Sequence, residues 1–127
     1  MANIDQTPLL IEGGIYRSET ITAAGADTFA KGTILARDTS TLKFVLFVKG
    51  GSTNGNGIPG AVLMEDLVYS GAGDKTSNIA IAGTFNQSKL IIDADGDASN
   101  IDGAVVDGLR AKGLNPVVST DLVGYDN

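Results

Sequence analysis

Residues 32–48, Gly-Thr-Ile-Leu-Ala-Arg-Asp-Thr-Ser-Thr-Leu-Lys-Phe-Val-Leu-Phe-Val, decide the fold class of this chain. Two apolar runs, residues 32–36 and residues 43–48, flank the polar turn at residues 38–41. The second run is apolar at successive positions, which is typical of a strand that is buried on both faces. The stretch therefore predicts two short strands joined by a turn, and a fold that is mainly β.

The chain on the C-terminal side of this stretch continues the same alternation of short apolar runs and turn residues. Residues 49–57 contain four glycines and two Asn-Gly pairs, so we expect an exposed loop there. Residues 78–85 alternate large and small side chains, as a strand packed on one face does. Further strands are expected at residues 61–66 and 89–92, with a second loop at residues 70–75.

One segment near the C-terminus has helical spacing. Its apolar face consists of Ile101, Ala104, Val105, Gly108 and Leu109. Ser99 or Asn100 can serve as N-cap, with Asp102 supplying negative charge in the first turn. Gly113 is placed to be the C′ residue, and Val117-Val118 predicts a final short strand. The expected fold class is thus mainly β with one short C-terminal helix.

The first 28 residues are small, polar and weakly patterned. Residues 7–12 form an extended-looking stretch, which the Gly13-Gly14 pair interrupts. We expect a flexible arm that does not bury itself, with Leu9, Leu10 and Ile11 outside the core. The expected organisation is an N-terminal arm (1–28), a compact β-rich domain (29–120) and a loose tail (121–127).

Composition excludes several classes of function. The 127 residues carry nine basic and fifteen acidic side chains, a formal charge of −6, so nucleic acid and anionic membranes are poor partners. The chain has no cysteine and no histidine, which makes Ser–His–Asp and Cys–His catalysis impossible. No apolar run reaches the roughly 18 residues that span a bilayer, and the start lacks the basic region of a signal peptide.

The sharpest local motif is Asp93-Ala94-Asp95-Gly96-Asp97, whose alternate carboxylates could converge on calcium. Counted from Asp93, however, Gly96 stands at position 4 and Ala104 at position 12, whereas an EF-hand needs Gly at 6 and Glu at 12. An acidic turn without metal is therefore expected. Glu65 and Asp66 point to opposite faces of their strand, so they do not predict a shared catalytic site. We expect no catalytic residue, no metal ligand and no cofactor.

The order of these elements resembles the lambda-type bacteriophage head decoration protein D family over residues 15–118. The residues that carry the resemblance are Gly32–Ser40, Lys43–Val45, Pro59–Leu63, Ala82–Phe85 and the closing segment Asp102–Val118. The individual motifs are turns and apolar strands, and their order and spacing together carry the match.

The resemblance implies a β-tulip domain that forms homotrimers and is not an enzyme. Such trimers bind the major capsid protein on the outside of the expanded icosahedral head, at threefold and quasi-threefold positions, and stabilise it against DNA pressure. It also implies a virion protein of the outer capsid surface, made in the host cytoplasm, whose N-terminal arm becomes ordered on the capsid. The expected capsid-binding residues are Thr7, Pro8, Leu9, Leu10, Ile11, Glu12, Ile15 and Tyr16.

Two rival interpretations remain at this point. One is another virion surface module, such as a tail-fibre domain or a receptor- or carbohydrate-binding β domain. A carbohydrate-binding site favours exposed aromatic residues, and the chain has three Tyr, four Phe and no Trp. The other is a small enzyme or metal-binding module, for which the sequence offers no specific signature.

Overall fold

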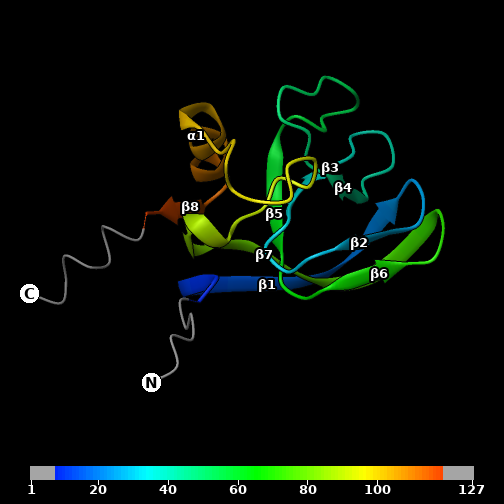
Figure 1. Cartoon of the computed structure of the whole chain (residues 1–127), viewed down its shortest axis with the longest axis horizontal. Coiled ribbons are helices and arrows are strands. Elements are labelled where there is room, and N and C mark those ends of the chain that lie inside the picture. The colour runs from blue at the N-terminus through cyan, green and yellow to red at the C-terminus, as the bar shows by residue number, and fades with distance from the viewer. Residues whose placement is uncertain (1–7, 119–127) are drawn as a thin grey trace, which may run out of the picture.

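The computed structural model describes residues 8–118 and consists of β-strands with one α-helix near the C-terminal end (Figure 1). This confirms the predicted fold class. In chain order the elements are β1 (Leu10–Ala23), β2 (Asp27–Phe29), β3 (Ile34–Arg37), β4 (Phe44–Leu46), β5 (Pro59–Leu63), β6 (Leu67–Tyr69), β7 (Gly73–Asn86), the 3₁₀ turn η1 (Gln87–Lys89), α1 (Gly103–Ala111) and β8 (Leu114–Val117).

Five of the strands close into a small barrel. The main sheet has the order β1-β4-β3-β5-β7-β8, and β1 also pairs with β7, so the sheet joins back on itself. β1 meets β4 at a single register position, Ile21 opposite Phe44, and meets β7 along almost its whole length. β8 lies outside the closed ring, parallel to the end of β7, and β2 and β6 form a separate two-stranded sheet.

The interior of the barrel holds one of two apolar clusters. Side chains alternate along each strand, so on β3 Leu35 points into the barrel while Ile34 and Ala36 point out. The small β2–β6 sheet contributes Phe29 and Tyr69 to the interior cluster, with ring centroids 5.2 Å apart. The hydroxyl of Tyr69 donates a hydrogen bond to the backbone carbonyl of Ile21. The buried tyrosine therefore ties β6 to β1.

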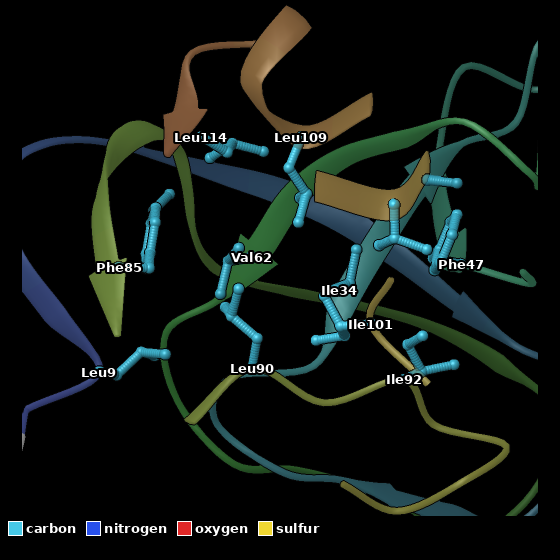
Figure 2. Close-up of a cluster of buried hydrophobic side chains, with 13 residues drawn as sticks. Leu9, Ile34, Phe47, Val62, Phe85, Leu90, Ile92, Ile101, Leu109 and Leu114 are labelled. Carbon is cyan, nitrogen blue, oxygen red and sulfur yellow. The ribbon is translucent and has the colours of Figure 1, made fainter. Parts of the chain in front are cut away.

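The second cluster lies on the outer face of β3, β5 and β7, beneath α1 (Figure 2). Val62, Phe85, Leu109 and Leu114 are all at most 1% exposed in this cluster. The strands β3, β4 and β5 are thus apolar on both faces, one face turned to each cluster. This explains why residues 44–47 are apolar at successive positions, as the sequence indicates.

The helix begins two or three residues later than the predicted N-cap implies. Its N-cap is Asp102, whose carboxylate accepts a hydrogen bond from the Val105 N–H at 3.1 Å, so the prediction of Ser99 or Asn100 as N-cap is wrong. The Ser99 N–H instead donates a hydrogen bond to the Asp97 carboxylate. Gly113 follows the C-cap with φ +83°, which confirms it as the C′ residue.

Three further expectations need correction. The loop predicted at residues 70–75 is shorter, because β7 already begins at Gly73 to pair with the end of β1. The strand predicted at residues 89–92 is the end of η1 followed by single bridges of Ile91 with Thr33 and of Ile92 with Asp97. The strands β2 and β6 are absent from the predictions, since each has only three residues.

Candidate functional site

The expected capsid-binding residues lie at the start of β1 and just before it. Thr7 lies outside the described residues. Pro8 and Glu12 are exposed, and Ile11 is partly buried. Leu9 is only 8% exposed, belongs to the outer apolar cluster, and accepts a hydrogen bond from the Asn86 N–H through its carbonyl. The expectation that Leu9 and its neighbours stay outside the core is therefore wrong for Leu9.

Leu10 packs against the same cluster, and its side chain occupies space that a side chain at Gly14 or Gly83 would fill. A Cβ on Gly14 would lie 2.6 Å from Leu10 Cδ2, and a Cβ on Gly83 would lie 2.7 Å from Leu10 Cδ1. The Gly13-Gly14 pair thus does not separate this segment from the domain. It lies within β1, at a place where the strand bulges and still pairs with β7.

Ile15 and Tyr16 follow directly after these bulges and are 54% and 47% exposed. Three register shifts between Leu10 and Tyr16 disturb the alternation of inward and outward side chains, which leaves two neighbouring apolar residues at the surface. In a regular strand one of the two would face inward. The structure brings Ile15, Tyr16 and Glu12 together on one exposed stretch of β1.

One edge of this part of β1 has no strand partner within residues 8–118. β7 occupies the opposite edge, and β4 meets β1 only at Ile21. The backbone N–H and C=O groups that point outward before Ile21 are available to another strand. We call residues 10–20 with this edge the open β1 edge.

The comparable edge of β7 is occupied by a side chain at Ser77 and Asn78. Glu65 accepts hydrogen bonds from the Ser77 hydroxyl at 2.6 Å and from the Asn78 N–H at 3.1 Å. These bonds, the one from Ser77 first, hold the pKa of Glu65 below its ordinary value. Asp66 instead accepts from the Lys31 N–H at 2.7 Å. The two adjacent carboxylates therefore fix different segments. They lie in the connection between β5 and β6, so the strand predicted at residues 61–66 is wrong at its end, because β5 stops at Leu63.

The acidic turn of residues 93–97 is held by local hydrogen bonds. Asp97 accepts from the Ser99 N–H at 2.9 Å, and its bonds to Ser99 lower its pKa. Burial, with the nearby charge of Asp27, raises the pKa of Asp93. Within residues 8–118, no three carboxylates gather closely enough to hold a metal ion. The same part of the chain contains no helix that is long and apolar enough to cross a membrane.

Comparison with known proteins identifies the family. Residues 2–114 match the family model described as bacteriophage lambda head decoration protein D. No curated protein matches the chain in a sequence search. The matched family consists of structural proteins of the phage head rather than enzymes, and it implies binding to the capsid and a location on the virion. The chain therefore belongs to the bacteriophage lambda head decoration protein D family, whose members decorate phage heads.

Proposed function

We propose that the chain binds as a homotrimer to the outside of the expanded icosahedral head, at threefold and quasi-threefold positions. There it holds neighbouring major capsid subunits together against the pressure of the packaged DNA. The contact runs along the N-terminal part of the chain, from Thr7 to Tyr16. The observation that carries this proposal is the open β1 edge beside exposed Ile15 and Tyr16.

Strand addition is the interaction that such an edge supports. An extended segment of a capsid subunit that pairs with residues 10–20 gains main-chain hydrogen bonds, each worth about 1 kcal/mol net. Burial of Ile15 and Tyr16 in the same contact adds about 25 cal/mol for each Å² of apolar surface removed from water. The side chains along residues 10–20 determine which segments can bind, because a segment whose side chains clash with them cannot pair with the edge.

A single edge of this kind binds weakly, since ordering the partner segment costs about 1–2 kcal/mol per residue. A homotrimer closed by a threefold axis presents three identical edges to a site of the same symmetry. Linked contacts raise the overall affinity by about 10²–10⁴ over that of one contact. Trimerisation therefore turns a weak edge contact into a clamp across several capsid subunits.

Co-sedimentation with purified heads tests the proposed function. We expect the full chain to pellet with expanded empty heads, to remain in solution with unexpanded heads, and to raise the temperature at which expanded heads break. Density on decorated heads should show threefold units. Equal binding to both head forms, or isolated single subunits on the capsid, would contradict the proposal.

A further inference from the structure

The glycine-rich loop between β4 and β5 carries the two Asn-Gly pairs of the chain, Asn54-Gly55 and Asn56-Gly57. In such a pair the backbone nitrogen of the glycine can attack the side-chain carbonyl carbon of the asparagine, because glycine has no Cβ to hinder the approach. In Figure 1 this loop projects from the upper side of the molecule, whereas β1 runs along the lower side. The two pairs are therefore separate from the open β1 edge.

The first pair is loosely held. The Asn54 side chain is exposed and makes no hydrogen bond with any group of residues 8–118. Its φ is +48°, in the left-handed region that asparagine adopts more readily than most residues. The Gly55 N–H likewise donates no hydrogen bond within the described residues. Among these residues, the peptide between Asn54 and Gly55 is held by one hydrogen bond, from the Thr39 N–H to the Asn54 carbonyl at 2.9 Å.

The second pair is held through its side chain as well as its backbone. The Asn56 carbonyl accepts a hydrogen bond from the Val48 N–H at 2.8 Å, and its Oδ1 accepts from the Thr53 N–H at 3.1 Å. A Cβ at Gly51 would collide with this side-chain amide, and a Cβ at Gly57 would collide with the Gly51 backbone. Attack by the Gly57 nitrogen must therefore break the bond to Oδ1 and move a packed amide.

We propose that Asn54 is a site of spontaneous deamidation in the folded protein and that the fold protects Asn56. The Gly55 nitrogen forms a bond to Cγ of Asn54, and the side-chain nitrogen leaves as ammonia, which takes up the Gly55 proton through water. A water molecule then opens the resulting cyclic imide at either of its carbonyls, which gives aspartate or isoaspartate. The reaction consumes one water, releases one ammonia and changes no oxidation state. It makes the formal charge of −6 one unit more negative.

Ageing of the purified full chain tests the proposal. After incubation in a mildly alkaline buffer, peptide mass spectrometry locates each converted asparagine by the mass difference between an amide and an acid. We expect Asn54 to convert at least tenfold faster than Asn56, equivalent to about 1.4 kcal/mol, since reaction at Asn56 also breaks the bond from Thr53. Incubation in water that carries a heavy oxygen isotope should place the isotope in the product.

The unfolded chain is the matched control for the effect of the fold. In concentrated urea neither asparagine keeps its hydrogen bonds, and each is still followed by glycine. The two should then convert at similar rates. A preference for Asn54 that persists in urea would show that the local sequence, and not the fold, selects the site, and would contradict the proposal.

A pair of glycine variants tests why Asn56 is protected. Gly51→Ala places a Cβ where the Asn56 amide lies, so it should raise the rate at Asn56 and leave the rate at Asn54 unchanged. Gly71→Ala is the matched control, because a Cβ there meets nothing within 4 Å, and it should alter neither rate.

Three results would overturn the proposal: equal rates at the two sites in the folded chain, faster conversion at Asn56, or no conversion during a period that converts the chain in urea. An unchanged Asn56 rate in Gly51→Ala would also contradict it, because the amide contact would then not be what protects Asn56. The proposal goes beyond decoration of the head and requires no partner. Since no heads are present in these experiments, either result leaves the capsid-binding test independent.

Discussion

The two halves of β1 differ in regularity and in exposure. From Arg17 to Ala23 the strand pairs residue by residue with β7, and Ile21 and Ala23 lie inside the barrel at 0% and 3% exposure. From Leu10 to Tyr16 the register shifts three times, and Ile15 and Tyr16 face solvent. One strand thus contributes its regular half to the barrel and displays its bulged half at the surface. The difference suggests that stability and recognition can be altered separately along one element.

The largest effect on stability is expected from the regular half. Ile21→Ala should lower the free energy of unfolding by about 3–4 kcal/mol, because it removes apolar contacts and leaves a cavity inside the barrel. Urea denaturation measures this. Ile15→Ala is the matched control on the same strand and should cost less than about 1 kcal/mol. Equal losses at both positions would show that the two halves are equally built into the core.

Leu9 tests where the exposed half of the N-terminal segment begins, because its side chain is buried. Leu9→Ala should cost about 2–3 kcal/mol, at the lower end of the range for buried leucines, because a residue near the chain end can relax. Deleting residues 2–14 should likewise destabilise the domain, because it removes Leu9 and Leu10. Thermal unfolding of the truncated chain checks this. An unchanged melting temperature after removal of Leu9 would mean that the segment is an independent arm.

The exposed half should govern binding. Replacement of both Ile15 and Tyr16 by serine should weaken binding to expanded heads at least tenfold, about 1.4 kcal/mol, with little loss of stability. Val68→Ser, a matched change at an exposed strand residue, should bind like the unaltered chain. Titration of heads with fluorescent protein measures both affinities. Equal affinities for the two variants would remove these side chains from the contact.

The smallest effect concerns acid stability of the regular half. Asp74 accepts from the Lys43 ammonium and the Thr22 hydroxyl, each at 2.6 Å, and these bonds hold its pKa below the ordinary 3.8. A lowered folded pKa adds stability above pH 3.8, and that stability is lost as the pH falls through the folded value. The melting temperature should therefore fall in acid, and less steeply for Asp74→Asn. Equal slopes for the two proteins would exclude this contribution.

The sequence predicts the elements of this fold better than the placement of its N-terminal segment. Two-sided apolar runs such as residues 44–47 directly reflect the two clusters, and the helix follows from its spacing. The Gly13-Gly14 pair, by contrast, has the composition of a hinge, and only the partner strand β7 makes it a bulge. The exposure of Ile15 and Tyr16 likewise depends on register shifts, which no local pattern specifies.

The open groove that Leu42, Ile58 and Lys112 line could not be predicted for a similar reason. Leu42 belongs to a polar turn in the sequence, and Ile58 follows a glycine-rich loop, so neither has a pattern of its own. Lys112 reaches them only through the packing of α1, where Gly108 lies against Pro59. Three segments that are far apart in the chain form this surface, and its chemistry appears only when the barrel and the helix are assembled.

Hydrogen–deuterium exchange of the protein, free and bound to expanded heads, tests the central claim most directly. Peptides that cover residues 10–16 should gain protection on binding, because the open β1 edge forms new main-chain hydrogen bonds. Amides near Ile21 should not change, since β4 and β7 flank the strand there in the free protein. Protection confined to other surfaces, with residues 10–16 exchanging at the same rate in both states, would contradict the account.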